Sequence, residues 1–165
     1  MLGTVVGVVA VVVLVLVVLA VVWFVGMRTK WRPVIDFQRR ANRRVINPRQ
    51  MRTAGEPGAY AGIVRHVGRR SGRAYETPVV PLPTDDGFVI VLVYGARSEW
   101  VRNVLAAGGA TIVLEGSTYE VVDPEVVPAD ESGRDFTDAE RREMRRFGNR
   151  MCLRVRRADA SAGEP

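Results

Sequence analysis

Residues 68–73 form a glycine-bounded segment that concentrates positive charge. Arg69, Arg70 and Ser71 stand between two glycines, and Arg73 follows directly. Glycines permit positive φ and allow backbone N–H groups to converge on an anion. Paired guanidinium groups suit phosphate or carboxylate because their donors are forked. The segment therefore predicts an anion-binding turn, although the motif by itself also fits a solvated basic hairpin tip.

The elements on either side must position this turn. Apolar residues precede and follow it, so residues 60–67 and 75–82 are predicted to be two strands joined by a turn at 68–72. The second strand contains prolines at 78 and 81 and is followed directly by Pro83, and none of these can donate to a ladder. It is therefore expected at an edge of the sheet or at a bulge.

The middle of the chain alternates apolar runs with turn signals. Residues 88–93 are continuously apolar and predict a buried central strand, and Ser98 is a candidate N-cap for a helix over 100–107. Strands are predicted at 110–114 and 118–122, joined by a tight turn.

The last third of the chain is less regular. Residues 123–136 are acidic and interrupted by prolines, so we expect irregular structure there. Thr137 and Glu140 form a capping box that opens a short helix ending near Phe147, and 151–156 predict a last strand. Hairpin-linked strands with inserted helices predict a mainly β (α+β) fold, an antiparallel barrel with peripheral helices, over a doubly wound sheet.

A second stretch, residues 94–105, makes the pattern more specific. Its sequence is YGARSEWVRNVL, in which Trp100 and Asn103 share one helix face. Together with the sequence HVGRRSGRAYETPV at 66–79, it resembles the deazaflavin-dependent nitroreductase family over about residues 34–122. The resemblance implies a split β-barrel that binds coenzyme F420, an 8-hydroxy-5-deazaflavin.

The resemblance also implies how the cofactor is held. The arginine turn would grip its phosphate and acidic tail, the Thr-Pro pair would line the deazaflavin, and the Tyr-Gly pair would close over it. The Trp-Asn helix face would look into the cofactor groove. No catalytic side chain is assigned, because hydride transfer needs orientation more than a protein acid or base. The assigned residues are Arg69, Arg70, Ser71, Thr77, Pro78, Tyr94, Gly95, Trp100 and Asn103.

The resemblance implies hydride transfer from reduced F420. With the membrane anchor predicted below, we expect a membrane-anchored oxidoreductase whose acceptor is lipophilic and electron-poor, such as a quinone or a nitro compound. Flavin mononucleotide, which some relatives of this barrel use, is the second choice of cofactor. The alternative is a non-catalytic, membrane-tethered protein that binds a deazaflavin, a flavin or a lipid. By family analogy the barrel could form a homodimer.

The first 27 residues predict a transmembrane helix. Residues 2–27 are uncharged and dominated by valine. The length of this segment exceeds the roughly 20 residues that a helix needs to cross a bilayer. A signal peptide would carry basic residues ahead of its apolar core. Here Arg28, Lys30 and Arg32 follow it, so we predict a single-pass protein of the cell membrane with its soluble part in the cytoplasm.

The remaining boundaries follow from composition. Residues 28–58 predict a basic amphipathic helix over 33–47 and a linker, either a spacer or a contact with anionic lipid. Residues 59–157 form the predicted barrel domain, and 158–165 a flexible tail. His66 is expected to be a satisfied structural residue. The net charge of +6 does not by itself indicate nucleic acid, because the basic stretches lack interleaved aromatics. The residues contain no metal-binding motif.

Overall fold

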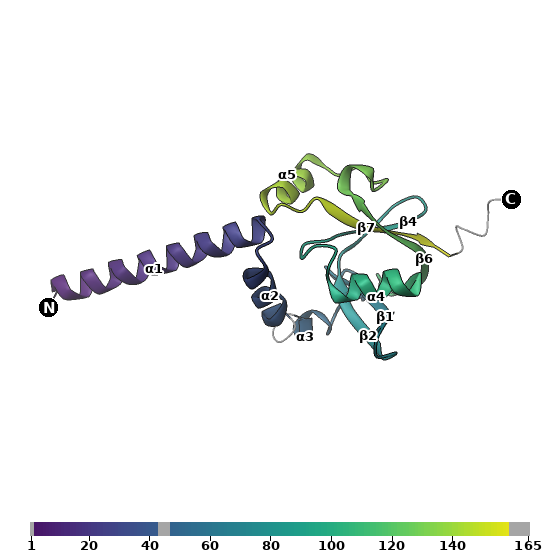
Figure 1. The fold of residues 1–165 in the computed structure, drawn as a ribbon, viewed down its shortest axis with the longest axis horizontal. Helices are drawn as coiled ribbons and strands as arrows, with labels where there is room; N and C mark the ends of the chain where they lie inside the picture. Colours follow the sequence, from purple (N-terminus) through teal and green to yellow (C-terminus); the bar gives the residue numbers. More distant parts are fainter. Residues whose placement is uncertain (1, 43–46, 159–165) are drawn as a thin grey trace.

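A computed structural model describes residues 2–42 and 47–158 of the chain. Three helices precede a seven-stranded sheet: α1 (Leu2–Arg28), α2 (Arg32–Ala41) and α3 (Asn47–Gln50) (Figure 1). The strands are β1 (Gly62–Val67), β2 (Ala74–Val79), β3 (Pro81–Pro83), β4 (Gly87–Val91), β5 (Gly109–Leu114), β6 (Ser117–Pro128) and β7 (Met151–Arg157). Helix α4 (Glu99–Ala107) lies between β4 and β5, whereas η2 (Ala129–Glu131) and α5 (Asp138–Arg146) lie between β6 and β7.

The sheet is curled into a split barrel. Its strand order is β2-β1-β5-β6-β7-β4-β3, and every neighbouring pair is antiparallel. The two edge strands, β2 and β3, are separated along the chain by Val80 alone, so the sheet must bend until its edges approach each other. Both edges carry prolines, which cannot donate to a further strand. The predicted fold class is confirmed.

Two strand predictions were wrong in detail. Residues 75–82 are two short strands at opposite edges of the sheet, and the break at Val80 is where the barrel is split. Residues 123–136 are not wholly irregular, because β6 continues to Pro128. Asp123 adopts a φ of 51° and the register shifts between Val122 and Glu125, so a bulge takes Pro124 out of the ladder.

The basic helix is also shorter than predicted. Helix α2 ends at Ala41, and Asn47 and Pro48 open α3, where a proline needs no amide donor. Residues 43–46 of the predicted helix lie outside the described residues, as do residues 159–165 of the predicted tail.

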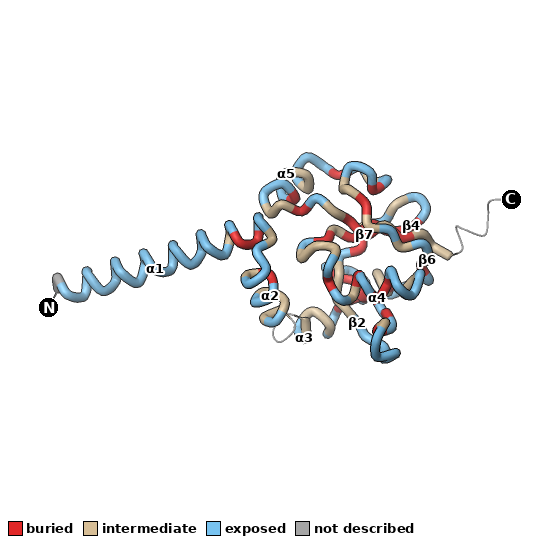
Figure 2. The backbone as a smooth tube through the Cα atoms, viewed as in Figure 1, coloured by how far each residue is buried: buried red, intermediate tan, exposed pale blue. Residues whose placement is uncertain are grey.

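Strands β4 and β7 are covered on both faces, which explains the unbroken apolar run at 88–93. Phe88, Ile90 and Leu153 face the main core, whose lining includes Val101 and Val104 of α4. The alternate residues of the two strands pack outward against Met144 of α5 and its neighbours. Figure 2 shows this burial gathered along β4 and β7.

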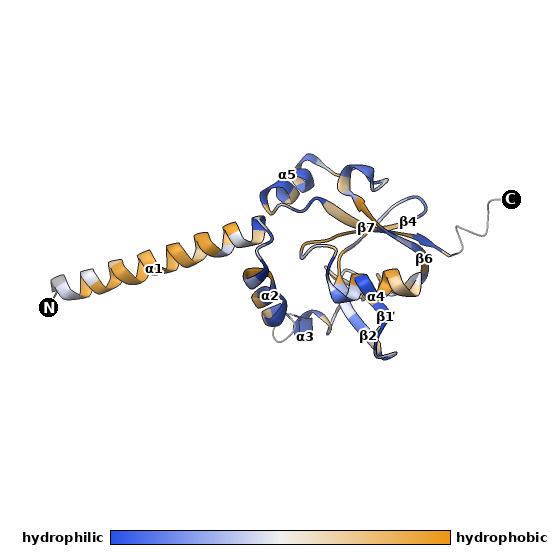
Figure 3. Ribbon diagram, in the orientation of Figure 1, coloured by the Kyte–Doolittle hydropathy of each residue, from blue (hydrophilic) through white to orange (hydrophobic). Residues whose placement is uncertain are grey.

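Helix α1 stands apart from the barrel along most of its length. Within the described chain it is the one helix long and apolar enough to cross a membrane, and its residues 4–22 are exposed (Figures 2 and 3). A signal sequence near an N-terminus can have the same length and apolar composition.

Candidate functional site

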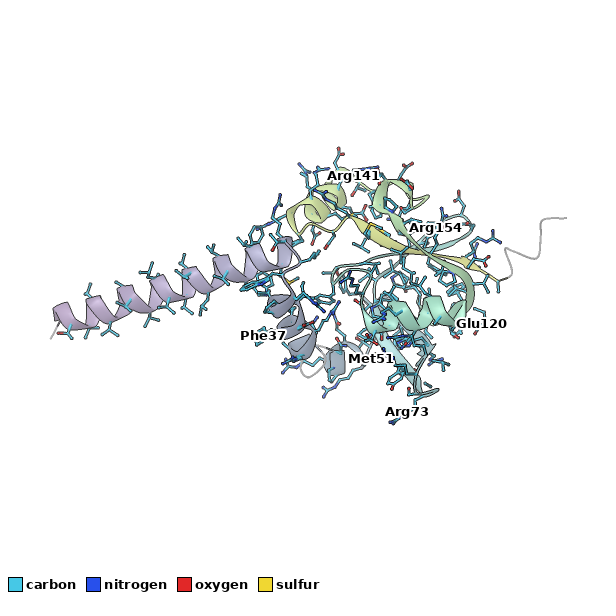
Figure 4. The ribbon with its side chains drawn as sticks, in the orientation of Figure 1. Phe37, Met51, Arg73, Glu120, Arg141 and Arg154 are labelled. Atoms are coloured by element: carbon cyan, nitrogen blue, oxygen red, sulfur yellow. The ribbon has the colours of Figure 1, made fainter. Side chains whose placement is uncertain are left out.

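The arginine turn closes the β1–β2 hairpin. The amide of Gly68 donates to the carbonyl of Arg73 at 2.8 Å, and Gly72 donates back to Gly68 at 2.8 Å. Gly72 takes a φ of 63°, which an L-residue with a side chain rarely adopts. Figure 4 shows Arg73 at the tip of this hairpin, pointing away from the barrel. The hairpin predicted from the sequence is confirmed.

Arg69 folds back from the turn onto helix α4. Its Nη1 donates to Glu99 Oε2 at 2.8 Å and to Asn103 Oδ1 at 2.9 Å. The same guanidinium holds the pKa of the Glu99 carboxyl below its usual value. Arg69 Nη2 is buried and has no partner within the described structure. An unmet, fixed donor of this kind fits an incoming anion.

Arg70 and Arg73 differ from Arg69 because both are exposed. Neither side chain forms an ion pair with any described residue. Ser71 Oγ lies 3.2 Å from the Tyr75 hydroxyl, which ties the turn to β2. The hairpin end therefore offers three cations with unmet donors, which suits a polyanionic cofactor.

Asn103 is buried, with 7 % of its surface exposed. Its Oδ1 accepts from the Arg69 amide at 3.2 Å as well as from the Arg69 guanidinium. Its Nδ2 lies 3.3 Å from His66 Nδ1, and His66 Nε2 lies 3.1 Å from Thr77 Oγ1. His66 is thus a satisfied residue, as predicted. These contacts bring the turn, α4, β1 and β2 together.

Thr77, Pro78 and Trp100 are all half-buried. Thr77 and Pro78 lie on the edge strand β2, opposite Val64 and Ile63 of β1. Trp100 packs on the main core from the first turn of α4. Ser98 occupies the N-cap position of that helix, but its hydroxyl donates to Gly95 O and does not cap.

Tyr94 and Gly95 are placed by helix α2. The Tyr94 hydroxyl accepts from Asn42 Nδ2, and the Tyr94 carbonyl accepts from Arg39 Nη2 at 2.8 Å. Burial raises the pKa of Tyr94, partly opposed by side-chain hydrogen bonds with Asn42 and Gln38 and by the charge of Arg39. Among the described residues, no hydrogen bond joins Tyr94 to the arginine turn. The Tyr-Gly loop is therefore a second group, held by helix α2.

Sequence reasoning missed Glu99, Arg39 and Asn42. Glu99 and Asn103 are four residues apart on one helix, so helical spacing could have found their shared contact with Arg69. No comparable local signal links Arg39 or Asn42 to Tyr94, because more than 50 residues separate them.

The junction of α1 and α2 is bonded into the barrel, and we call residues 24–31 the elbow. Lys30 Nζ donates to the Val93 carbonyl at 2.8 Å, to the Phe147 carbonyl and to Asn149 Oδ1. Burial lowers the pKa of Lys30. Arg28 Nη1 donates to the carbonyls of Arg145 and Arg146, the last residues of α5. A guanidinium there satisfies free carbonyls and complements the helix dipole.

The comparisons with known proteins decide the family. The model of the F420H(2)-dependent quinone reductase family matches residues 32–153. The chain belongs to this family. It is therefore an oxidoreductase and F420H2 is its cofactor. The F420-dependent part of the resemblance is confirmed, and the match extends beyond residue 122 to the start of β7.

Other likenesses are weaker. No curated protein matches the chain significantly. The crystal structure of the haem storage protein HutZ from Vibrio cholerae has 13 % identity and a TM-score of 0.39, covering 59 % of this chain and 81 % of its own. A further solved structure has 12 % identity and a TM-score of 0.35, covering 68 % of this chain and 89 % of its own.

Proposed function

We propose that this family member is a membrane-anchored quinone reductase, with its barrel in the cytoplasm, that reduces a lipid-soluble quinone. Bound F420H2 supplies a hydride and a proton, so the quinone becomes a quinol while the deazaflavin is oxidised. Membership of a reductase family favours this reading over the non-catalytic carrier. A nitro compound remains a second class of acceptor for the assay.

The observation that carries the anchor is the elbow. Met27 of α1 is buried, Phe24 meets the ring of Phe147 edge-on at 6.1 Å, and Lys30 reaches three acceptors in the barrel. A cleaved leader would not be expected to complete the packing of the domain it leaves. These contacts support a retained helix.

The orientation of the site agrees with a membrane acceptor. Figure 1 shows the β1–β2 hairpin tip far from the end of α1, whereas α2 and α5 flank that end. The arginine turn would thus bind the anionic tail away from the bilayer. The Tyr94 loop, bonded to α2, would close over the deazaflavin nearer the bilayer.

Residue roles follow from this orientation. Arg69, Arg70 and Ser71, with Arg73, would bind the phosphate and acidic tail, and Thr77, Pro78 and Trp100 would line the ring. Asn103 would act mainly by holding Arg69, because its carbonyl oxygen already accepts two bonds from that residue. The exposed side chain of Phe37, on the outer side of α2 in Figure 4, would enter the lipid interface.

The test is F420H2 oxidation by the full chain in lipid vesicles that contain a long-chain quinone. We expect deazaflavin absorbance and fluorescence to return only when protein and quinone share the vesicle. A protein that oxidises F420H2 with water-soluble quinones but never with the embedded quinone would overturn the membrane acceptor. Size analysis of the same preparation tests the homodimer.

Topology needs a separate experiment. Protease added to intact cells should leave the barrel uncut, whereas inverted membrane vesicles should lose it. Cleavage in intact cells would place the barrel on the opposite side of the membrane.

A further inference from the structure

The buried contacts of Asn103 fix the direction of a hydrogen-bond chain. Its oxygen faces two groups that can only donate, the amide and the guanidinium of Arg69. The side-chain amide therefore cannot be turned over, and its NH2 group must face His66.

The direction passes on through the imidazole. His66 Nδ1 faces the Asn103 NH2 and must accept, so the neutral ring carries its proton on Nε2. Nε2–H then donates to Thr77 Oγ1 at 3.1 Å. The ring is buried and stacks on Tyr75, with centroids 5.8 Å apart and planes at 20°, which fixes its orientation.

Thr77 ends the chain as a donor. Its oxygen accepts from His66, and within the described structure its own proton has no partner. Thr77 is half-buried on an edge strand whose other members are exposed or half-buried. Its hydroxyl is thus available to a molecule bound on this side of the barrel.

We propose that His66 is a positioning residue that sets the Thr77 hydroxyl as a hydrogen-bond donor to an acceptor atom of the bound deazaflavin. The inference rests on the proposed function, because it takes Thr77 as a cofactor contact. It also joins this donor to the anion-binding turn, since Asn103 is oriented by Arg69.

Protonation of His66 would break the chain at its Asn103 end, while Nε2–H would still donate to Thr77. A proton on Nδ1 would point at the Asn103 NH2, and two donors cannot bond. The groups facing the ring are Asn103 with Arg69 and its partner Glu99 on the α4 side, and Tyr75 and Thr77 on β2. Burial lowers the pKa of His66 below its ordinary 6.5, so the neutral form persists at neutral pH and is lost below that lowered pKa.

Nitrogen NMR of the full chain, without cofactor, tests the tautomer directly. His66 is the only histidine, so ¹⁵N-histidine labelling gives a single imidazole. We expect protonated Nε2 and bare Nδ1 at pH 7.5, and Asn103→Ala should remove this preference. Arg65→Ala is the control, because Arg65 is exposed and paired with Glu76. An Nδ1–H tautomer or an imidazolium would overturn the inference.

A double-mutant cycle tests the link to the cofactor. Thr77→Val and His66→Phe should each weaken F420 binding about three- to ten-fold in fluorescence titration. The double variant should bind no more weakly than the weaker of the two single variants. If the two losses of affinity multiply in the double variant, the residues act independently and the inference is overturned. His66→Gln replaces His66→Phe if the latter does not fold.

The pH dependence separates positioning from a purely structural role. Wild-type affinity should fall at pH values below the lowered His66 pKa, because Asn103 then loses its bond to the ring and holds Arg69 less firmly. The His66→Gln profile should stay flat over the same range. Identical profiles would overturn the inference. Wild-type protein that shows the Nε2–H tautomer but binds no F420 would instead overturn the proposed function, and with it the cofactor contact of Thr77.

Discussion

At the scale of single residues, the arginines of the β1–β2 turn have different roles. Arg69 is held by two partners on α4, whereas Arg70 and Arg73 are exposed. Arg69 is therefore part of the structure of the site, and its substitution would disturb Asn103 as well as any ligand. Arg70 offers the cleaner test of anion binding.

We predict that Arg70→Ala weakens binding of polyglutamylated F420 about ten-fold, because one charge-assisted contact is lost. A deazaflavin without the anionic tail should lose less. Unfolding in denaturant should be unchanged, since Arg70 has no ion pair among the described residues. Arg65→Ala, which removes a nearby arginine paired with Glu76, is the matched control. Equal losses for both cofactors would place Arg70 away from the tail.

The only cysteine provides a second residue-scale prediction. Cys152 on β7 is 0 % exposed, and burial raises the pKa of its thiol to about 11. Since the thiolate is the reactive form, a maleimide should leave the native protein unlabelled at pH 8 and label it in guanidinium chloride. Rapid labelling of native protein would contradict this burial.

At the scale of elements, sequence patterns predicted what is local. The capping box of α5 is present, with Thr137 and Glu140 bonded reciprocally, and the apolar run at 88–93 gives β4. The path of β6 past Pro124 was missed because a bulge depends on the partner strand. The His66–Asn103 contact was missed for a similar reason, since 37 residues separate the two. Tertiary pairing, which leaves no local signature, decided both.

Strand β4 also supplies a stability prediction. A Cβ at Gly87 would overlap the carbonyl oxygen of Val155 on β7. Gly87→Ala should therefore destabilise the barrel by about 1–3 kcal/mol, the usual cost of overpacking, measured as a lower midpoint of urea unfolding. Ser117→Ala, at an exposed end of β6, is the control and should change little. An unchanged midpoint for Gly87→Ala would contradict this prediction and would mean that β4 and β7 can move apart at little cost in stability.

At the scale of the whole molecule, the elbow couples the apolar helix to the site. Lys30 bonds the carbonyl of Val93, the residue just before Tyr94, and α2 bonds Tyr94 itself. The loop expected to close over the cofactor is thus fixed to the elements that follow the proposed membrane anchor. The position of the barrel relative to α1 and the closure of the Tyr94 loop are therefore expected to be coupled.

We predict that Lys30→Met slows reduction of a vesicle-embedded quinone more than reduction of a water-soluble quinone. Three hydrogen bonds are lost, so the barrel should tilt more freely and the Tyr94 loop should loosen. Arg32→Met removes one charge at an exposed position of α2 and is the control. The prediction fails if both quinones slow equally or if the control reproduces the loss.

The long reach of Lys30 has a consequence for how the protein is made. Its bonds to Phe147 and Asn149 join residues 117 and 119 positions apart. Synthesis must pass Asn149 before these bonds can form, and closing so long a loop carries an entropic cost. Contacts of such separation also slow folding. If the apolar helix is the proposed anchor, it is thus available for membrane insertion first, and its junction with the barrel forms only after nearly the whole domain has emerged.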